Sequence, residues 1–156
     1  MIKRKIDVTY VYFYAIILSK VNIMREEIAK LTKEAVLKVS NWGMLGFSGY
    51  VITNKKELYF YQYYEHMPKG YTEEELNFVI KKKDLTSEEF TAVTDFIKTE
   101  VFGKEFEDKM IFDAGFDVFV CLDGISKNIK NDKGFDDKEG LYDKAEALVK
   151  SLIDEE

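Results

Sequence analysis

Cysteine, histidine and proline occur once each in this chain of 156 residues, and their scarcity excludes several kinds of chemistry. The single Cys121 cannot form an intramolecular disulfide, and because it lies in an apolar stretch we expect an inert, buried thiol. The single His66 cannot build the common zinc sites, which combine several His or Cys ligands. Because the chain has one proline and no Gly/Ser-rich linker, we expect residues 1–156 to form a single domain.

Apolar runs long enough to cross a membrane are also missing. The most apolar stretch, Val8–Leu18, has 11 residues, whereas a transmembrane helix needs about 20, and no cleavage site typical of a signal peptide follows it. Its tyrosines, Tyr10, Tyr12 and Tyr14, alternate with apolar residues, as in a β-strand. We therefore expect a strand here. An uncleaved anchor, or an extension ahead of a start at Met24, is the alternative.

Glycine-rich motifs that hold nucleotides are absent from the sequence as well. Gly43, Gly46 and Gly49 are spaced three apart, which matches neither a dinucleotide-binding fingerprint nor a phosphate-binding loop. Ser48 lacks the flanking residues of a nucleophile elbow. We expect these glycines to end a helix and start a strand, and we expect no cofactor.

Carboxylates are the groups left for catalysis or metal binding. Asp113 and Asp117 flank one predicted turn and can approach each other, whereas Asp132, Asp136 and Asp137 lack the spacing of an EF-hand loop. We interpret these acids as turn and capping residues, and we expect no catalytic residue and no metal site. A small carboxylate-dependent enzyme, with the lone histidine as a helper, is the alternative function.

Tyrosine, by contrast, is abundant, and several of the 10 tyrosines alternate regularly with other residues. Residues 49–64 predict a β-hairpin that turns at Asn54 and Lys55. Along its second strand Tyr59, Tyr61 and Tyr63 occupy every other position, so they share one face of the sheet.

The length of the hairpin loop decides what lies beside these tyrosines. An even loop pairs Tyr50 with Tyr59 and keeps a Tyr/Ser face apart from an aliphatic face. An odd loop of three residues pairs Tyr50 with Phe60 and Ile52 with Leu58, which mixes the two faces. We therefore favour the even loop.

If adjacent strands carry both groups of alternating tyrosines, their rings gather on one face and offer a recognition surface. Tyrosine suits such a surface because its ring supplies contact area at small entropic cost and its hydroxyl can hydrogen-bond to a partner. In the alternative arrangement a helix covers the rings. The predicted partner-binding residues are Tyr10, Tyr12, Tyr14, Tyr50, Tyr59, Tyr61 and Tyr63.

Helical periodicity is present in three stretches. Residues 24–39, 86–102 and 138–153 each carry an apolar stripe at helical spacing. The second stretch begins with a capping box formed by Thr86 and Glu89. We expect a helix in each.

Two further stretches are strand-like. Residues 76–82 predict the third strand of a meander, or else a short helix opened by Thr72 and Glu75. After a predicted turn at Ala114 and Gly115, residues 116–122 are apolar at consecutive positions, which predicts a central strand covered on both faces. We expect residues 123–140 to form a loop.

Together these elements predict an α+β fold: a single domain with an antiparallel or mixed sheet of about five or six strands and three main helices. If the three helices gather on one face of the sheet, the other face is free to bind a partner.

The charge is distributed unevenly along the chain. Positions 1–40 carry eight Lys or Arg against four Asp or Glu, and positions 41–156 carry 15 against 25, so the net charge of −6 divides into +4 and −10. Such an acidic field disfavours nucleic acid and anionic membranes and favours basic partners.

We therefore expect a soluble, cytoplasmic, acidic protein-binding module that neutralises a basic toxin or effector. In its acidity, its aromatic strands and its lack of catalytic motifs, the chain resembles in kind the small bacterial proteins that neutralise a toxin. That resemblance extends to no shared motif. A subunit of a homo-oligomer, whose tyrosine face is its dimer contact, is a further alternative.

Overall fold

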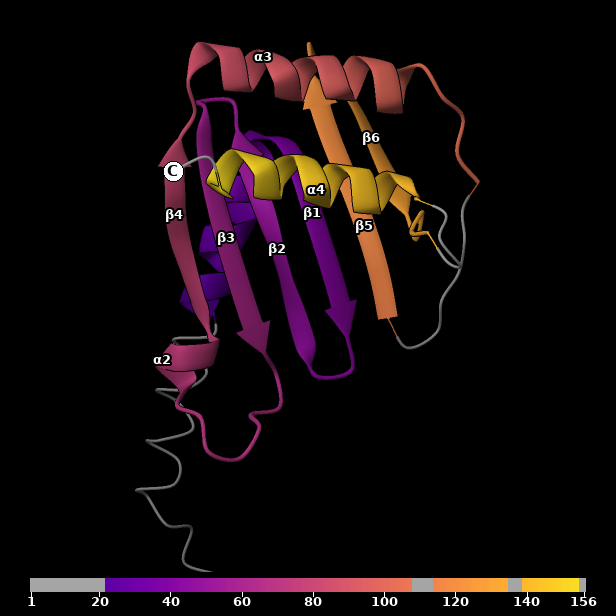
Figure 1. Ribbon diagram of the computed structural model, residues 1–156. Helices are drawn as coiled ribbons and strands as arrows, with labels where there is room; N and C mark the ends of the chain where they lie inside the picture. The colour runs from indigo at the N-terminus through magenta and orange to yellow at the C-terminus, as the bar shows by residue number, and fades with distance from the viewer. Residues whose placement is uncertain (1–21, 108–113, 135–138, 155–156) are drawn as a thin grey trace, which may run out of the picture.

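The computed structural model describes residues 22–107, 114–134 and 139–154. Within these residues six strands form one antiparallel sheet in the order β4-β3-β2-β1-β5-β6 (Figure 1). The strands are β1 (Ala35–Gly43), β2 (Gly46–Thr53), β3 (Glu57–Tyr64), β4 (Phe78–Asp84), β5 (Ala114–Leu122) and β6 (Ile125–Lys130). The sheet and its helices confirm the predicted α+β fold class.

Helices cover both faces of this sheet. One runs over residues 22–34 and lies behind the sheet in Figure 1, whereas α4 (Leu141–Asp154) crosses the front. At the upper end α3 (Ser87–Phe96) continues as the π-helix η1 (Ile97–Phe102), and a single turn, α2 (Glu73–Leu76), lies at the opposite end. None of the helices in the described residues has the length and apolar character needed to cross a bilayer.

Two hydrophobic cores result, one on each side of the sheet. Consecutive strand residues point to opposite faces, so Ile52 packs into the main core under α3 and α4 while Val51 packs against the 22–34 helix. The three predicted helices therefore do not gather on one face. The second core contains Met24, Ile28, Leu31, Ala35, Val51, Tyr61 and Tyr63.

The first predicted helix ends earlier than its apolar stripe indicated. The helix stops at residue 34, and β1 begins at Ala35, so the prediction of a helix as far as Val39 is wrong. Residues 35–39 satisfy a strand better, because Leu37 and Val39 are buried in the main core at 0% and 1% exposure. Pairing of β1 with both β2 and β5 then supplies its backbone hydrogen bonds on both sides.

The tyrosine-rich hairpin is formed by β2 and β3, but its register differs from the one we favoured. Tyr50 pairs with Phe60 and Ile52 with Leu58, which is the register of a three-residue loop. Lys56 adopts a left-handed conformation (φ 63°), and its N–H donates to the Thr53 carbonyl at 3.0 Å. This register buries two aliphatic side chains together in the main core, and it places Tyr50 on the face opposite Tyr59.

Residues 72–84 combine both structures that the sequence left open. Thr72 and Glu75 form a capping box that opens α2, and β4 follows after Asn77 and pairs with β3 as the third strand of a meander. The capping box of Thr86 and Glu89 is confirmed as well, because it opens α3.

The loop predicted over residues 123–140 is wrong in its first part. Residues 125–130 form β6, which returns along β5 through a tight turn at Asp123 and Gly124. Both turn residues have positive φ, 52° and 77°, which is the conformation that Asp-Gly hairpin turns prefer.

The turn predicted at Ala114 and Gly115 is also wrong, because both residues lie in β5. Gly115 pairs with Trp42, and a Cβ added there would lie 1.9 Å from the indole Nε1. Because glycine has no side chain, the Trp42 indole can pack directly over the backbone of β5 at this position.

The expectation of an interior strand is confirmed, because β5 pairs with both β1 and β6. Coverage is complete on one face only: Val118 and Val120 are 1% and 0% exposed in the main core, whereas Phe119 on the other face is half-buried.

Some predictions fall outside the described residues. The strand predicted over Val8–Leu18, with Tyr10, Tyr12 and Tyr14, is among them, as are Asp113, Asp136 and Asp137.

We predict that Thr86→Ala lowers the free energy of unfolding by about 1 kcal/mol, the usual cost of losing an N-cap. The Thr86 hydroxyl accepts the Glu89 N–H at 3.2 Å, and the Glu89 carboxylate accepts the Thr86 N–H at 2.7 Å. Urea denaturation measures the change. Thr91→Ala is the control, because Thr91 is exposed within the same helix and its hydroxyl donates to the Ser87 carbonyl instead of capping the helix. Equal losses for the two variants would contradict the capping role.

Candidate functional site

The predicted tyrosine row is present on one face of β3, but a helix covers most of it. Tyr61 and Tyr63 are 2% and 6% exposed beneath the 22–34 helix, and Tyr59 is half-buried. This is the covered arrangement that the sequence left as an alternative. Tyr50 lies on the other face, packed beside Phe60 with ring centroids 5.0 Å apart. The structure therefore separates Tyr50 from the row, and the partner-binding role of these tyrosines stays a prediction.

Tyr61 is the most deeply placed member of the row. It lies opposite Gly49, where an added Cβ would lie 2.7 Å from the Tyr61 hydroxyl and 2.5 Å from the Val39 carbonyl oxygen. Glycine at position 49 thus makes room for the phenol to reach Ser40 on β1, with which its hydroxyl hydrogen-bonds. Burial raises the pKa of the Tyr61 hydroxyl, and the bond to Ser40 offsets part of that increase.

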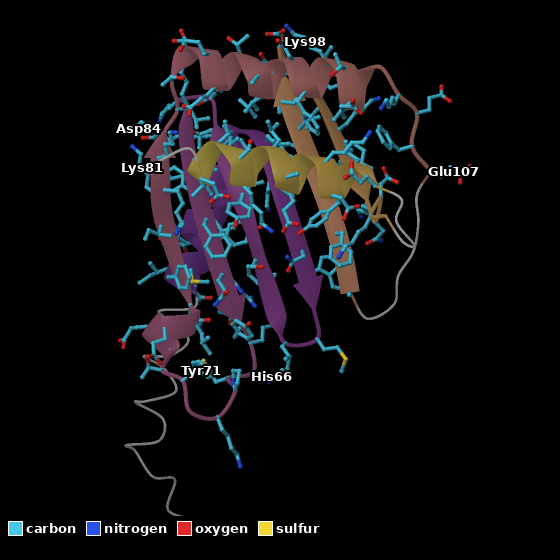
Figure 2. The ribbon with its side chains drawn as sticks, in the orientation of Figure 1. His66, Tyr71, Lys81, Asp84, Lys98 and Glu107 are labelled. Atoms are coloured by element: carbon cyan, nitrogen blue, oxygen red, sulfur yellow. The ribbon has the colours of Figure 1, made fainter. Side chains whose placement is uncertain are left out.

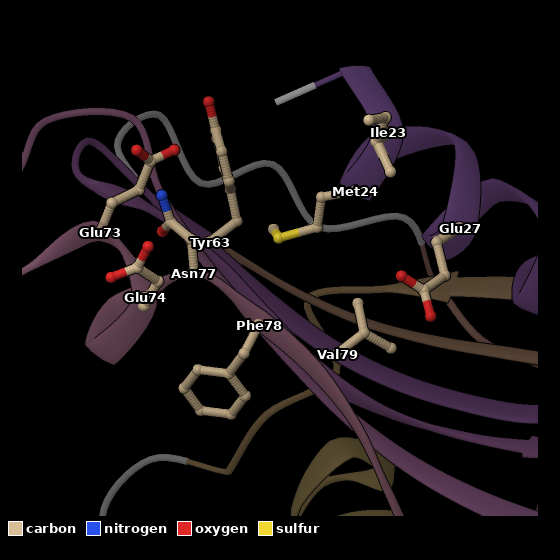
Figure 3. Close-up of a pocket in the computed structure, with 9 residues that line it drawn as sticks. All are labelled: Ile23, Met24, Glu27, Tyr63, Glu73, Glu74, Asn77, Phe78 and Val79. Carbon is tan, nitrogen blue, oxygen red and sulfur yellow. The ribbon is translucent and has the colours of Figure 1, made fainter. Parts of the chain in front are cut away.

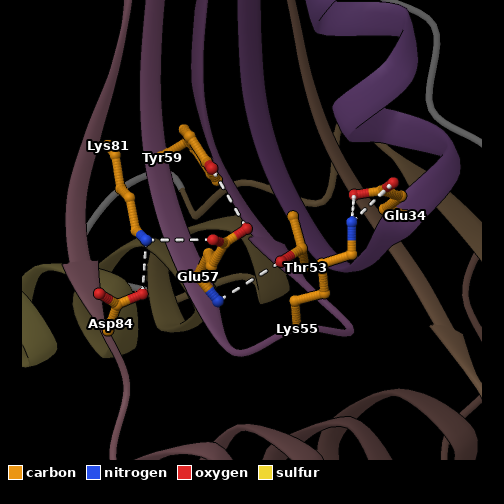
Figure 4. Close-up of polar contacts among 7 residues, drawn as sticks. All are labelled: Glu34, Thr53, Lys55, Glu57, Tyr59, Lys81 and Asp84. Carbon is orange, nitrogen blue, oxygen red and sulfur yellow. Dashed lines mark hydrogen bonds and ion pairs between the residues drawn. The ribbon is translucent and has the colours of Figure 1, made fainter.

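Tyr59, at the hairpin end of the row, has a hydroxyl that takes part in a network of hydrogen bonds and ion pairs within the protein. The hydroxyl donates to Glu57 Oε2 at 3.2 Å, and Glu57 also pairs with Lys81 at 3.0 Å (Figure 4). Lys81 in turn pairs with Asp84 at 2.6 Å. Asp84 and Glu57 raise the pKa of Lys81, and Lys81 lowers the pKa of Glu57. Partner binding through the Tyr59 hydroxyl would therefore compete with this network.

A polar row continues from Tyr61 across the sheet. Ser40 lies opposite Asp117, and Asp117 opposite Lys130. Lys38, next to this row, donates to Thr32 Oγ1 at 3.2 Å. Burial lowers the pKa of Lys38 and raises the pKa of Asp117, and each charge partly offsets the shift of the other. Opposite shifts of this kind occur at acid–base sites and also in structural ion pairs.

The remaining candidates from the sequence do not gather at one place. Cys121 is half-buried on β5, and His66 is exposed on the loop between β3 and α2, at the end of the molecule away from Lys98 (Figure 2). Asp132 has the capping role we assigned to it, since its Oδ2 accepts the N–H of Leu141 at the start of α4. Within the described part of the chain, no group of three or more His, Cys, Asp or Glu side chains could hold a metal ion.

A pocket of about 230 Å³ lies where the 22–34 helix and α2 meet β3 and β4 (Figure 3). We call it the glutamate pocket, because all the charged side chains among its described lining residues are glutamates. Glu27 comes from the 22–34 helix on one side, and Glu73 and Glu74 come from α2 on the other. The other lining residues are Ile23, Met24, Tyr63, Asn77, Phe78 and Val79.

Asn77 is the residue of this pocket that a described hydrogen bond ties to the sheet. Asn77 Oδ1 accepts the Tyr64 N–H at 2.7 Å, which ties the end of α2 to β3. Arg25 stacks on the Tyr63 ring at 5.7 Å from its centroid and pairs with Glu65 at 3.2 Å, a residue that does not line the pocket. Tyr63 is the predicted tyrosine that contributes to the pocket wall.

Sequence reasoning missed the three pocket glutamates. Glu73 and Glu74 follow the predicted N-cap Thr72, and Glu27 follows Glu26 on an exposed helical face, so each has an ordinary local explanation. Acidic residues on two separate helices are a weak indication of a shared binding pocket. The pairing of β3 with β4 is what brings the two helices to one pocket.

A second exposed feature is the β1–β2 turn. Trp42, Met44 and Leu45 are 41%, 75% and 55% exposed, and they border a groove that Tyr64 and Phe116 also line. Apolar side chains exposed together often mark an interaction surface.

Comparisons of the chain with protein-family models, with curated proteins and with solved structures find no match.

We predict that Tyr61→Ala lowers the free energy of unfolding by about 3 kcal/mol or more, because it leaves a cavity in the second core. Tyr59→Ala, at a half-buried position, is expected to cost less. Tyr71→Ala is the control, since Tyr71 is 59% exposed and its loss is expected to change stability by about 0.5 kcal/mol at most. Chemical denaturation measures all three. A loss at Tyr61 as small as that at Tyr71 would contradict its burial.

Stability at alkaline pH provides a separate test of Tyr61. Above its usual pKa of 10.0 the unfolded chain releases the phenolic proton, whereas the folded protein retains it, so the free energy of unfolding falls as the pH rises above about 10. We predict that Tyr61→Phe makes this decline shallower, and that Tyr71→Phe, at an exposed position, leaves it unchanged. Urea denaturation from about pH 8 to about pH 11 measures the slopes. Equal slopes for Tyr61→Phe and the unaltered protein would contradict the raised pKa of Tyr61.

Proposed function

We propose that this protein is an acidic binding module that captures a basic protein, such as a toxin or an effector, in the cytoplasm. The glutamate pocket carries the proposal. Its apolar walls and three carboxylates are complementary to a protein surface that carries lysine or arginine side chains among apolar ones.

The ion-pairing state of two pocket carboxylates, Glu27 and Glu73, supports this proposal. No ion pair with another described residue holds Glu27 or Glu73, whereas Glu34, Glu57 and Glu100 each pair with a lysine. An unpaired carboxylate beside apolar walls gains more from a partner's cation than one already neutralised within the protein.

The overall charge supports it as well. Positions 41–156 carry 25 acidic against 15 basic residues, so the long-range field attracts cationic surfaces and speeds their encounter. Direct binding of nucleic acid or of an anionic membrane is disfavoured by the same field. The single Cys121 is consistent with the reducing conditions of the cytoplasm.

The tyrosines take unequal parts in this proposal. Tyr63 contributes as a wall of the pocket, while Tyr61 contributes through the stability of the second core. Tyr10, Tyr12 and Tyr14 lie outside the described residues and remain predicted contacts.

The test is to purify the tagged protein from its own host, identify what co-purifies by mass spectrometry, and reconstitute the complex from purified components. We expect a stoichiometric basic protein whose affinity falls steeply as the salt concentration rises, because surface charges are screened within about 10 Å at 0.1 M salt.

Other outcomes contradict the proposal and favour one of the alternatives. A bound metabolite would favour the carboxylate-dependent enzyme. Self-association that Leu45→Asp abolishes would favour a homo-oligomer, formed through the exposed apolar turn instead of the tyrosine face. A neutral or acidic partner with salt-independent affinity would contradict the electrostatic basis.

A further inference from the structure

We infer that the glutamate pocket receives a single long cationic side chain, lysine or arginine, that projects from an apolar segment of the partner and anchors it. This inference rests on the proposed function and makes it specific. It distinguishes recognition at one pocket from attraction spread over an acidic surface.

The size of the pocket favours a side chain over a cofactor or a metabolite. Its volume is about 230 Å³, whereas sites for small organic ligands measure roughly 300–1,000 Å³. Three of its lining residues, Met24, Tyr63 and Val79, belong to the second core or pack against it, so this part of the wall is formed without the partner.

The distribution of polarity matches a lysine or an arginine. Met24, Phe78 and Val79 form an apolar zone between the glutamates of the two helices (Figure 3). The methylene stem of a long basic side chain can lie on such a zone while its charged head reaches the carboxylates at the rim. A purely apolar side chain would leave the charges of Glu27 and Glu73 unneutralised, and an anionic group would be repelled.

The pocket glutamates are accessible for such a contact. Glu27 is exposed and Glu73 is half-buried, and neither forms an ion pair with another described residue that would have to break first. Arg25, which stacks on the pocket residue Tyr63, forms its ion pair with Glu65.

The experiment uses the full chain, labelled with ¹⁵N, and two short capped peptides that differ at one position. One peptide has a single arginine between leucines, and the other has citrulline, which keeps the shape of arginine and lacks its charge. Two-dimensional NMR titrations follow the backbone amides. We expect the arginine peptide to shift amides of Met24, Glu27, Asn77 and Val79, and the citrulline peptide to bind roughly tenfold more weakly.

A matched pair of variants separates the pocket from the overall charge. Glu27→Gln with Glu73→Gln removes two charges at the pocket, and Glu88→Gln with Glu105→Gln removes two at exposed positions outside it. We expect the pocket variant to weaken the arginine peptide about tenfold or more, and the control variant less than twofold. Thermal unfolding verifies that both variants remain folded.

The inference fails if both double variants weaken the peptide equally, if citrulline binds as well as arginine, or if the shifted amides lie elsewhere. The proposed function fails separately. If the reconstituted basic partner binds both double variants alike and with steep salt dependence, the proposed binding function is supported and the single-side-chain contact at the glutamate pocket is wrong. If no basic partner binds the unaltered protein, the proposed function itself is wrong.

Discussion

The alternation of side chains along β2 and β3 is the constraint on which both cores depend. The three-residue loop sets a register in which Ile52 meets Leu58 on one face and Gly49 meets Tyr61 on the other. A shift by one residue would exchange the faces of one strand and would carry the Tyr61 hydroxyl away from Ser40. The main core, the second core and the position of the 22–34 helix all follow from this register.

Because helices pack on both faces, the best candidate site lies at an end of the sheet. The glutamate pocket forms where the 22–34 helix and α2 meet β3 and β4, so its walls belong to the packed structure while its carboxylates remain at the surface. A rigid apolar wall with accessible charges reduces the ordering cost of binding, since few protein groups must move. The site therefore depends on the second core for its shape.

Local patterns were sufficient where the deciding interactions lie close together in sequence. The capping box at Thr86 was predicted correctly, and the one at Thr72 was recognised as an alternative, because each cap satisfies an N–H group three residues away. The same holds for the helix at the C-terminus and for the shared face of Tyr59, Tyr61 and Tyr63, which follows from the strand period alone. The hairpin turn at Asp123 and Gly124 was missed, because residues 123–140 were predicted to be a loop, although this residue pair is a recognised local hairpin signal.

The sequence by itself determined the α+β class, the α3 capping box and the alternation of the tyrosines, all of which depend on neighbouring residues. Only the tertiary structure decided that residues 35–39 form a strand. Burial of Leu37 and Val39 in the main core, together with pairing of β1 to β2 and β5, outweighs a weak helical preference. Tertiary structure also covered Tyr61 and Tyr63 with a helix and placed Glu27 and Glu73 on opposite sides of one pocket. Contacts between distant segments have no local signature, since they arise from the packing of whole elements.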